Sequence, residues 1–251
     1  MIHLLRISLI IAVMMSQNVY AQTVTVAVAS NMKPAFEAIY QEFNLKHSKD
    51  LRIVYGSSGN LASQIKQGAP FNLFISADEF FPTRLFQEGL AKDAGVVYAI
   101  GHLALIANTA SGIKLNADPI QIQSALSQSK KIAIANPELA PYGHAAVQYL
   151  KSSKLWEVSK AKLVYGENIS VATMYVSSGA ANVGITALSL AKAPELAGII
   201  QFIPLPDSLY TPIRQRMILM KNSPPLAMEL YEYLQGPSAK MILLRYGYSV
   251  P

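Results

Sequence analysis

The 251-residue sequence contains no cysteine, one tryptophan and few charged residues, which make up 14% of the chain. The absence of cysteine excludes a disulfide scaffold, a cysteine-ligated zinc site, an iron–sulfur cluster and a cysteine nucleophile. Dense basic runs are also absent, so the formal net charge of +6 argues for solubility and a weak attraction for anions, and we expect no nucleic-acid partner. Hydrophobic residues make up 51%, which is typical of a globular protein and not of a disordered one.

Residues 1–21 predict a secretory signal peptide. Arg6 supplies a positive charge, residues 7–15 form a short apolar run, and residues 19–21 (Val-Tyr-Ala) fit a cleavage site. A membrane anchor is the alternative, but a spanning helix needs about 20 apolar residues, and polar residues 16–18 come too early. We therefore expect an exported protein in a bacterial periplasm. A lipoprotein is not expected, because no cysteine stands at the cleavage site.

Apolar, β-rich segments alternate with segments of helical spacing along the rest of the chain. The predicted strands are residues 24–29, 51–55, 73–75, 103–107, 131–135, 162–165, 199–203 and 213–220. The predicted helices are residues 34–43, 61–66, 145–150, 170–177, 188–193, 226–234 and 238–245. This alternation predicts an α/β fold with mostly parallel sheets flanked by helices. No linker separates two consecutive domains, so if there are two lobes, the chain crosses between them in strands or short loops, near Gly101 and near Pro204–Pro206. The lobes would then be residues 22–101 with 208–251 and residues 102–207, with a ligand cleft between them.

Four strand-to-helix junctions carry small or donor-bearing residues. They are residues 29–31 (Ala-Ser-Asn), 56–60 (Gly-Ser-Ser-Gly-Asn), 140–143 (Ala-Pro-Tyr-Gly) and 166–169 (Gly-Glu-Asn-Ile). Ligands of open α/β sheets bind at the carboxyl ends of strands, and helix N-termini there favour anions. Helix capping alone could explain any one junction. Together, converging in one cleft, the four predict an anion site.

None of these junctions contains Lys or Arg, which limits the kind of anion. A small, fully ionised oxyanion can be held by neutral N–H and O–H donors alone. A protonated anion would be rejected, because its O–H would face donors and a buried unpaired group costs ~1–3 kcal/mol. Glu167 is the one carboxylate beside the site, and we expect it to point away or to cap its helix.

The same junctions resemble motifs of the periplasmic molybdate-binding proteins that serve ABC transporters. The matching segments are Val-Ala-Ser-Asn at 28–31, GSSGNLASQIKQGAP with FNLFISAD at 56–78, ANPELAPYGHAA at 135–146, YGENI at 165–169, Gly-Ile at 184–185 and the C-terminal GPSAKMILLRYGY. The resemblance covers nearly the whole chain after the signal. It implies the two-lobed type II periplasmic binding-protein fold and a monomer that captures molybdate or tungstate for a membrane permease. It implies no enzymatic activity and no cofactor.

Carried over residue by residue, the resemblance implies five oxyanion contacts. Ser30 and Ser58 would donate hydroxyl and backbone hydrogen bonds, Tyr142 and Ile169 would donate backbone N–H groups, and Asn31 is implied beside the first serine. All would touch the oxygens of molybdate, with no direct ligation of the metal. Two departures concern ligand preference: Ala187 stands near the place of a tyrosine that some members use, and Asn72 stands where the family often has Asp.

Two other functions stay open from the residues. A receptor for sulfate, phosphate or thiosulfate would have the same build, since selection among tetrahedral anions depends on cavity size. A secreted serine hydrolase would need a serine, a histidine and an acid. Here Gly56-Ser57-Ser58-Gly59 is one residue short of the nucleophile motif, although His144 could approach Ser58 across the cleft.

Overall fold

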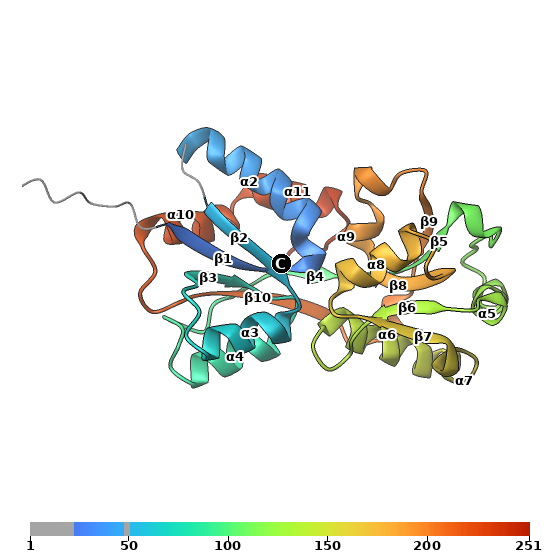
Figure 1. Ribbon diagram of the computed structural model, residues 1–251. Helices are drawn as coiled ribbons and strands as arrows, with labels where there is room; N and C mark the ends of the chain where they lie inside the picture. The colour runs from blue at the N-terminus through green and yellow to red at the C-terminus, as the bar shows by residue number, and fades with distance from the viewer. Residues whose placement is uncertain (1–22, 48–50) are drawn as a thin grey trace, which may run out of the picture.

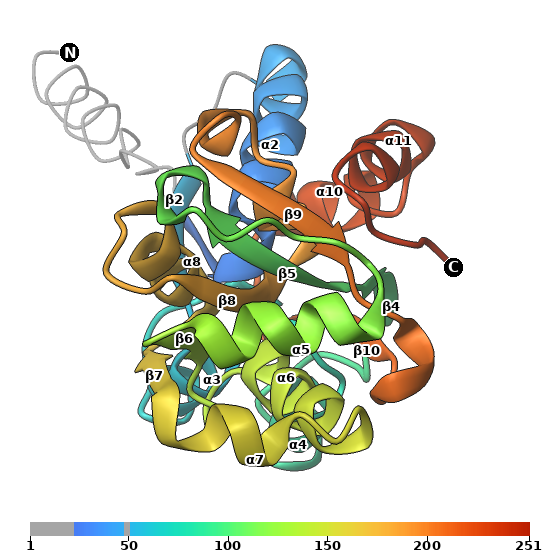
Figure 2. The same ribbon diagram turned by 90° about the vertical axis from the view of Figure 1, so that its right-hand side faces the viewer.

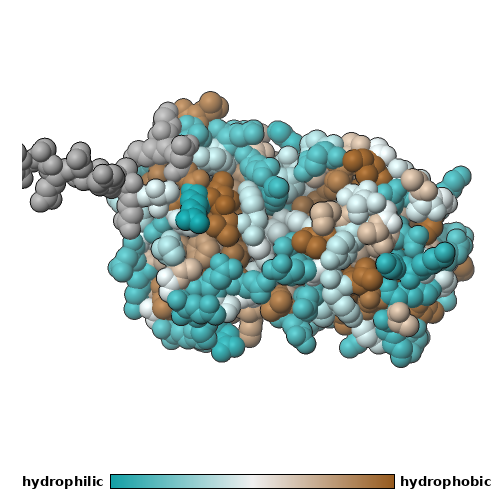
Figure 3. Space-filling view, viewed as in Figure 1, coloured by the Kyte–Doolittle hydropathy of each residue, from teal (hydrophilic) through white to brown (hydrophobic). Residues whose placement is uncertain are grey.

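The computed structural model describes residues 23–47 and 51–251, so the predicted signal peptide lies outside the described residues. The described chain forms two α/β lobes that lie side by side, as Figure 1 shows. Each lobe is built around its own five-stranded sheet. Hydrophobic residues are exposed in separate patches among hydrophilic ones on the face seen in Figure 3. No helix among the described residues is long and apolar enough to span a membrane.

The strands are β1 Val24–Ala29, β2 Leu51–Gly56, β3 Leu73–Ile75, β4 Val96–Gly101, β5 Leu103–Asn108, β6 Ile132–Ala135, β7 Leu163–Gly166, β8 Val183–Ala187, β9 Ile200–Pro204 and β10 Ile213–Leu219. The helices are α2 Lys33–His47, α3 Ser58–Lys66, α4 Phe80–Gln87, α5 Pro119–Gln128, α6 Pro141–Ser152, α7 Trp156–Ser159, α8 Ile169–Ser177, α9 Leu188–Ala191, α10 Pro225–Tyr233 and α11 Pro237–Arg245. A 3-10 turn, η1, covers Ser30–Met32.

The first lobe holds a sheet of order β2-β1-β3-β10-β4. Its strand β1 alternates between two cores: Val24, Val26 and Val28 pack with α2, α10 and α11, whereas Ala27 packs with α3 and α4 on the other face. Both faces are therefore covered, which is why every residue of β1 is buried and all but Thr25 are apolar. Strands β1 and β2 are parallel and their last residues, Ala29 and Gly56, are register partners. The two junctions that follow these strands therefore emerge side by side.

The second lobe, which faces the viewer in Figure 2, repeats this arrangement with the order β7-β6-β8-β5-β9. Helix α6 packs on one face of the sheet, and α8 and α9 pack on the other. Strands β6 and β7 are parallel, with Ala135 opposite Gly166 at their ends. The other two junctions of the predicted site therefore also leave neighbouring strands at the same level.

The chain passes from the first sheet to the second between Gly101 and Leu103, and it returns between Pro204 and Ile213. The predicted α/β architecture of two lobes is confirmed. Each sheet is mixed, because β10 is antiparallel to β3 and β4, and β5 is antiparallel to β8 and β9. Those antiparallel strands adjoin the two crossings, where the chain enters a new sheet without a helix that could reverse its direction.

Candidate anion-binding site

The residues of all four junctions meet in one small pocket between the lobes. Its lining consists of Ala29, Ser30, Asn31, Gly56, Ser57, Ser58, Ala77, Ala140, Pro141, Tyr142 and Ile169. The cavity volume is about 10 Å³, far below the ~300–1,000 Å³ of pockets for drug-sized molecules. The five predicted contact residues all lie in this lining and are at most 4% exposed. The pocket therefore suits a small guest that both lobes enclose.

Ser30 and Asn31 form the start of η1, directly after β1 ends. The Ser30 carbonyl accepts a hydrogen bond from the Ser170 hydroxyl of the other lobe at 3.0 Å. Within the described part of the chain, the Ser30 hydroxyl itself has no hydrogen-bond partner, although the residue is only 4% exposed. A buried hydroxyl that lines a pocket without a partner is available to a ligand.

The first three N–H groups of α3 differ in their hydrogen-bond partners. The Asn60 N–H is capped by the Ser57 hydroxyl at 3.4 Å, and the Gly59 N–H donates to the Leu139 carbonyl of the second lobe at 2.9 Å. No acceptor in the described structure takes the N–H of Ser58, the first residue of the helix. The Ser58 hydroxyl accepts from the Ala77 N–H at 3.0 Å, so its own hydrogen is left to donate elsewhere.

Helices α6 and α8 leave matching donors on the second lobe. Pro141 begins α6 and has no N–H, so Tyr142 supplies the first free donor of that helix. In α8 the Asn168 side chain caps Val171, which leaves the N–H of Ile169 free. Neither the Tyr142 N–H nor the Ile169 N–H finds an acceptor among the described residues. Both are orphan donors of helix N-termini that line the pocket.

The pocket is electropositive although no Lys or Arg is among the described residues that line it. The N-termini of α3, α6 and α8 all reach it, and each helix end is equivalent to about half a positive charge. Together they offer roughly one and a half charges of fixed dipole to a guest, without any proton to lose. Such an arrangement can hold a small dianion whose oxygens are all acceptors.

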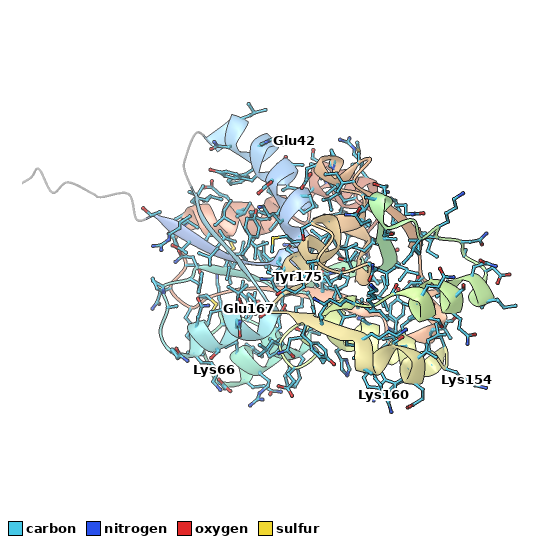
Figure 4. All side chains as sticks on the ribbon, turned by 45° about the vertical axis from the view of Figure 1, so that its right-hand side comes forward. Glu42, Lys66, Lys154, Lys160, Glu167 and Tyr175 are labelled. Atoms are coloured by element: carbon cyan, nitrogen blue, oxygen red, sulfur yellow. The ribbon has the colours of Figure 1, made fainter. Side chains whose placement is uncertain are left out.

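Contacts between the lobes close the pocket on its outer side. Besides the bond from Gly59 to Leu139, the Asn60 side-chain amide donates to Glu167 Oε1 at 2.8 Å. Figure 4 shows Glu167 where the second lobe meets the first. The cap of α8 is Asn168, so Glu167 does not cap its helix; it lies outside the pocket lining and joins the lobes instead. Entry or exit of a ligand requires these contacts to separate.

A buried polar cluster forms the floor of the pocket, and it was not predicted from the sequence. Gln215 of β10 accepts from Asn31 Nδ2 at 3.0 Å and from the Tyr98 hydroxyl at 2.8 Å, and it donates to the Tyr142 hydroxyl at 2.9 Å. The Tyr248 hydroxyl accepts from Asn31 Nδ2 at 2.9 Å. Burial raises the pKa of all three tyrosines, so their hydroxyls stay neutral.

Gly101, the last residue before the chain crosses to the second lobe, packs against this floor. A Cβ atom at Gly101 would lie 2.0 Å from the Tyr142 hydroxyl and 2.4 Å from Gln215 Nε2. Only glycine fits there, so the first crossing and the pocket floor are in direct contact.

Three residues discussed from the sequence lie away from the pocket lining. Asn72 pairs with Thr25 at 2.8 Å and lines a separate cavity, so it does not bear on the ligand as expected. Ala187 is buried at the end of β8 and lies outside the lining. His144 lines the neighbouring cavity, and the Ser58 hydroxyl meets a backbone N–H instead of an imidazole, so the hydrolase arrangement is not formed. The described residues contain no cluster of His and carboxylates that could hold a metal ion.

The neighbouring cavity also lies between the lobes and contains one unusual carboxyl group. Burial raises the pKa of Asp78 to about 6, although the Ser76 hydroxyl at 2.9 Å and the Phe81 N–H at 3.3 Å both donate to it. The nearby charge of Glu79 raises the pKa further, but Glu79 itself is paired with Arg214 and Arg216. Asp78 is therefore a carboxyl group whose ionisation is disfavoured in the folded state.

Comparisons with known proteins agree with this geometry. A molybdate-binding protein of Azotobacter vinelandii is 36% identical over 239 residues, covering 92% of this chain and 91% of the relative. One of Rhodobacter capsulatus is 34% identical over 235 residues, covering 91% and 88%. The solved periplasmic molybdate-binding protein of Azotobacter vinelandii superposes with a TM-score of 0.79 at 31% identity, covering 91% of this chain and 99% of that one. The model of the bacterial extracellular solute-binding protein family matches residues 24–249, and the chain belongs to that family.

Proposed function

We propose that this protein binds one molybdate or tungstate ion between its lobes and delivers it to the permease of an ABC transporter. The observation that carries the proposal is a buried pocket lined by neutral donors from both lobes, with no cationic side chain in the lining. The relatives described as molybdate-binding proteins support the choice of oxyanion. The periplasm is the proposed location, after export by the predicted signal peptide.

In the proposed complex, each oxygen of the anion accepts from groups that lack another partner. These donors are the hydroxyls of Ser30 and Ser58 and the backbone N–H groups of Ser58, Tyr142 and Ile169. Asn31 lines the same pocket, and its amide can join them once Nδ2 gives up its bonds to Gln215 and Tyr248. The metal atom is reached only through its oxygens. Asn31 takes the part of the tyrosine that some family members use near Ala187.

The proposed cycle consists of binding and release, with no chemical step and no cofactor. A dianion stabilises the closed arrangement because it bridges donors from both lobes. Because the lining residues are almost fully buried, the ion leaves only when the lobes separate, and docking on the permease supplies that step. We propose that the protein acts as a monomer and needs no nucleic-acid partner.

A thermal-shift panel with molybdate, tungstate, sulfate, phosphate and thiosulfate tests the proposal. A ligand at 100 times its Kd stabilises the folded state by about 2.7 kcal/mol, which raises Tm by roughly 5–10 °C in a protein of this size. We expect this shift with molybdate and tungstate, and little with the others. Stabilisation by sulfate, phosphate or thiosulfate alone would establish the alternative receptor, and no shift with any anion would refute the oxyanion site.

A further inference from the structure

The buried amide of Asn31 has one atom without a partner. Its Nδ2 makes two hydrogen bonds, to Gln215 Oε1 and to the Tyr248 hydroxyl, whereas its Oδ1 is buried and finds no partner among the residues that the structure describes. Asn31 is 1% exposed and lines the anion pocket. A buried acceptor without a donor is unfavourable. Because Nδ2 turns inward to the floor, Oδ1 is the amide atom left for the pocket, and in an anion site it faces charge of its own sign.

The surrounding hydroxyls can also satisfy a second arrangement of the amides. The single proton of the Tyr98 hydroxyl is shared between Gln215 Oε1 at 2.8 Å and the Ser76 carbonyl at 3.0 Å. Rotating the Gln215 amide by 180° would place Nε2 where Oε1 now lies. Tyr98 would then donate to Ser76 alone and accept from Gln215. The Tyr142 hydroxyl, which now accepts from Gln215, would donate to it.

The same rotation resolves the position of Asn31. With Gln215 Nε2 as a donor beside it, Asn31 can turn its Oδ1 inward to accept from Gln215. The Tyr248 hydroxyl, which now donates to the Asn31 backbone carbonyl and to Ser189 Oγ at 3.0 Å, would donate to Oδ1 instead, and the Asn31 carbonyl would keep its hydrogen bond from the Ser189 hydroxyl at 2.9 Å. The Nδ2 of Asn31 then faces the pocket as an additional donor. The two amides must turn together, because two N–H groups or two carbonyl oxygens cannot bond each other.

We infer that Gln215 is a positioning residue that decides which amide atom of Asn31 faces the anion, and thereby whether the pocket prefers deprotonated or protonated oxyanions. This inference rests on the proposed function. With Nδ2 in the pocket, the lining offers only donors and favours an anion whose oxygens all accept. With Oδ1 in the pocket, the lining offers one acceptor, which suits an anion that carries an O–H group.

Gln215→Glu separates the two arrangements, because an ionised carboxylate can only accept. In this variant the carboxylate at position 215 accepts hydrogen bonds from the Tyr98 and Tyr142 hydroxyls and from Asn31 Nδ2. These three hydrogen bonds favour the ionised form of the carboxyl group at mildly alkaline pH. The variant thus holds Asn31 with Oδ1 toward the pocket. Gln215→Met removes the hydrogen bonds without fixing either orientation. Gln148→Glu is the matched charge control, since it adds a carboxylate near the lobe boundary and keeps the acceptor of the Thr211 N–H.

Selenate and hydrogen arsenate are suitable probes, because they are tetrahedral dianions of similar size that differ by one proton. We expect the wild-type protein to prefer selenate in calorimetric titrations. Gln215→Glu should shift the ratio of the two Kd values toward arsenate by on the order of tenfold. Gln148→Glu should leave the ratio within about twofold of wild type, whereas Gln215→Met should give a ratio between those of the wild type and Gln215→Glu. A folded Gln215→Glu variant with the wild-type ratio overturns the inference.

A measurement on the wild-type protein keeps the test independent of how the variants fold. In the molybdate-bound protein, NMR cross-relaxation should connect the side-chain amide protons of Gln215 to the ring of Tyr98. A connection to the ring of Tyr142 in its place contradicts the inference. If neither molybdate nor selenate binds the wild-type protein, the proposed function fails. If they bind, but Gln215→Glu keeps the wild-type ratio of Kd values or the amide protons of Gln215 contact the Tyr142 ring, only the role of Gln215 fails.

Discussion

Gly59 offers a direct test of lobe closure, and Gly59→Ala is expected to weaken anion binding without destabilising the protein. A Cβ atom at this position would lie 2.9 Å from the Leu139 carbonyl oxygen, 3.1 Å from Leu139 Cα and 3.0 Å from Phe81 Cζ. Two of these atoms belong to the backbone of the second lobe. They cannot move out of the way without moving the lobe itself.

The expected size of the effect follows from these contacts. Carbon atoms pack best at about 3.5–4.0 Å, so the lobes would have to separate at this point by roughly half an ångström. Overpacking of this kind typically costs ~1–3 kcal/mol, which corresponds to about 5- to 150-fold in Kd. Within an isolated first lobe the same change should stabilise α3, because alanine is favoured over glycine in a helix by ~0.5–1 kcal/mol.

Calorimetric titration with molybdate measures the affinity, and chemical denaturation without anion measures the stability. Ser63→Ala serves as the control, because Ser63 lies on the exposed face of the same helix and away from the second lobe. We expect weaker binding and unchanged or higher stability for Gly59→Ala, and wild-type binding for Ser63→Ala. Wild-type affinity in Gly59→Ala would mean that the two lobes do not meet at Gly59 when the anion is bound.

Three further predictions follow from the site. Ser30→Ala or Ser58→Ala should each lose ~1–3 kcal/mol of molybdate binding, and the double variant should lose the thermal shift with molybdate; unchanged affinity in both single variants counts against the site. The pKa of Asp78, about 6 in the folded state, lies above its unfolded value, so stability should fall as pH rises from about 4 to 6. Asp78→Asn should flatten that profile in denaturation experiments and add up to about 3 kcal/mol at neutral pH; an unaltered profile would rule this out. Glu167→Ala removes the acceptor of Asn60, so stopped-flow release should quicken up to about fivefold, whereas equal rates in Glu167→Ala and Glu167→Gln would show that the contact has no role.

The parts of the fold that were predicted correctly are those with a strong local pattern. Strand β1 is apolar apart from Thr25, and α2 has apolar residues at helical spacing, so both were placed from sequence alone. Helix α4 and strand β4 were not predicted, because α4 carries Pro82 within an aromatic segment and β4 has no alternation of buried and exposed residues. Helix α3 begins at Ser58, three residues before the predicted start. Ser, Gly and Asn are poor helix formers, and here the other lobe and the Ser57 cap hold them in place.

The residues of the candidate site were also predicted only where a local sequence pattern marked them. The structure brings together all five residues named from the junctions, because strands that end in register deliver their following turns to one place. Gln215 and Tyr248 were missed because their importance comes from partners 184 and 217 residues away in the chain. One signal was available: Gln215 is a fully buried polar residue within a strand whose other inward side chains are apolar.

The contact of Gly101 with the floor of the pocket has a mechanical consequence. Gly101, where the chain crosses between the lobes, packs against Gln215 and Tyr142 of the pocket floor, whereas the contact of Asn60 with Glu167 is exposed at the rim of the pocket. If the lobes rotate about the Gly101 crossing, atoms that lie at the crossing move least, so the rim contact separates before the floor does. Water can therefore reach the rim while the ion keeps its inner bonds, and departure of the ion demands a wider swing than the breathing of the rim.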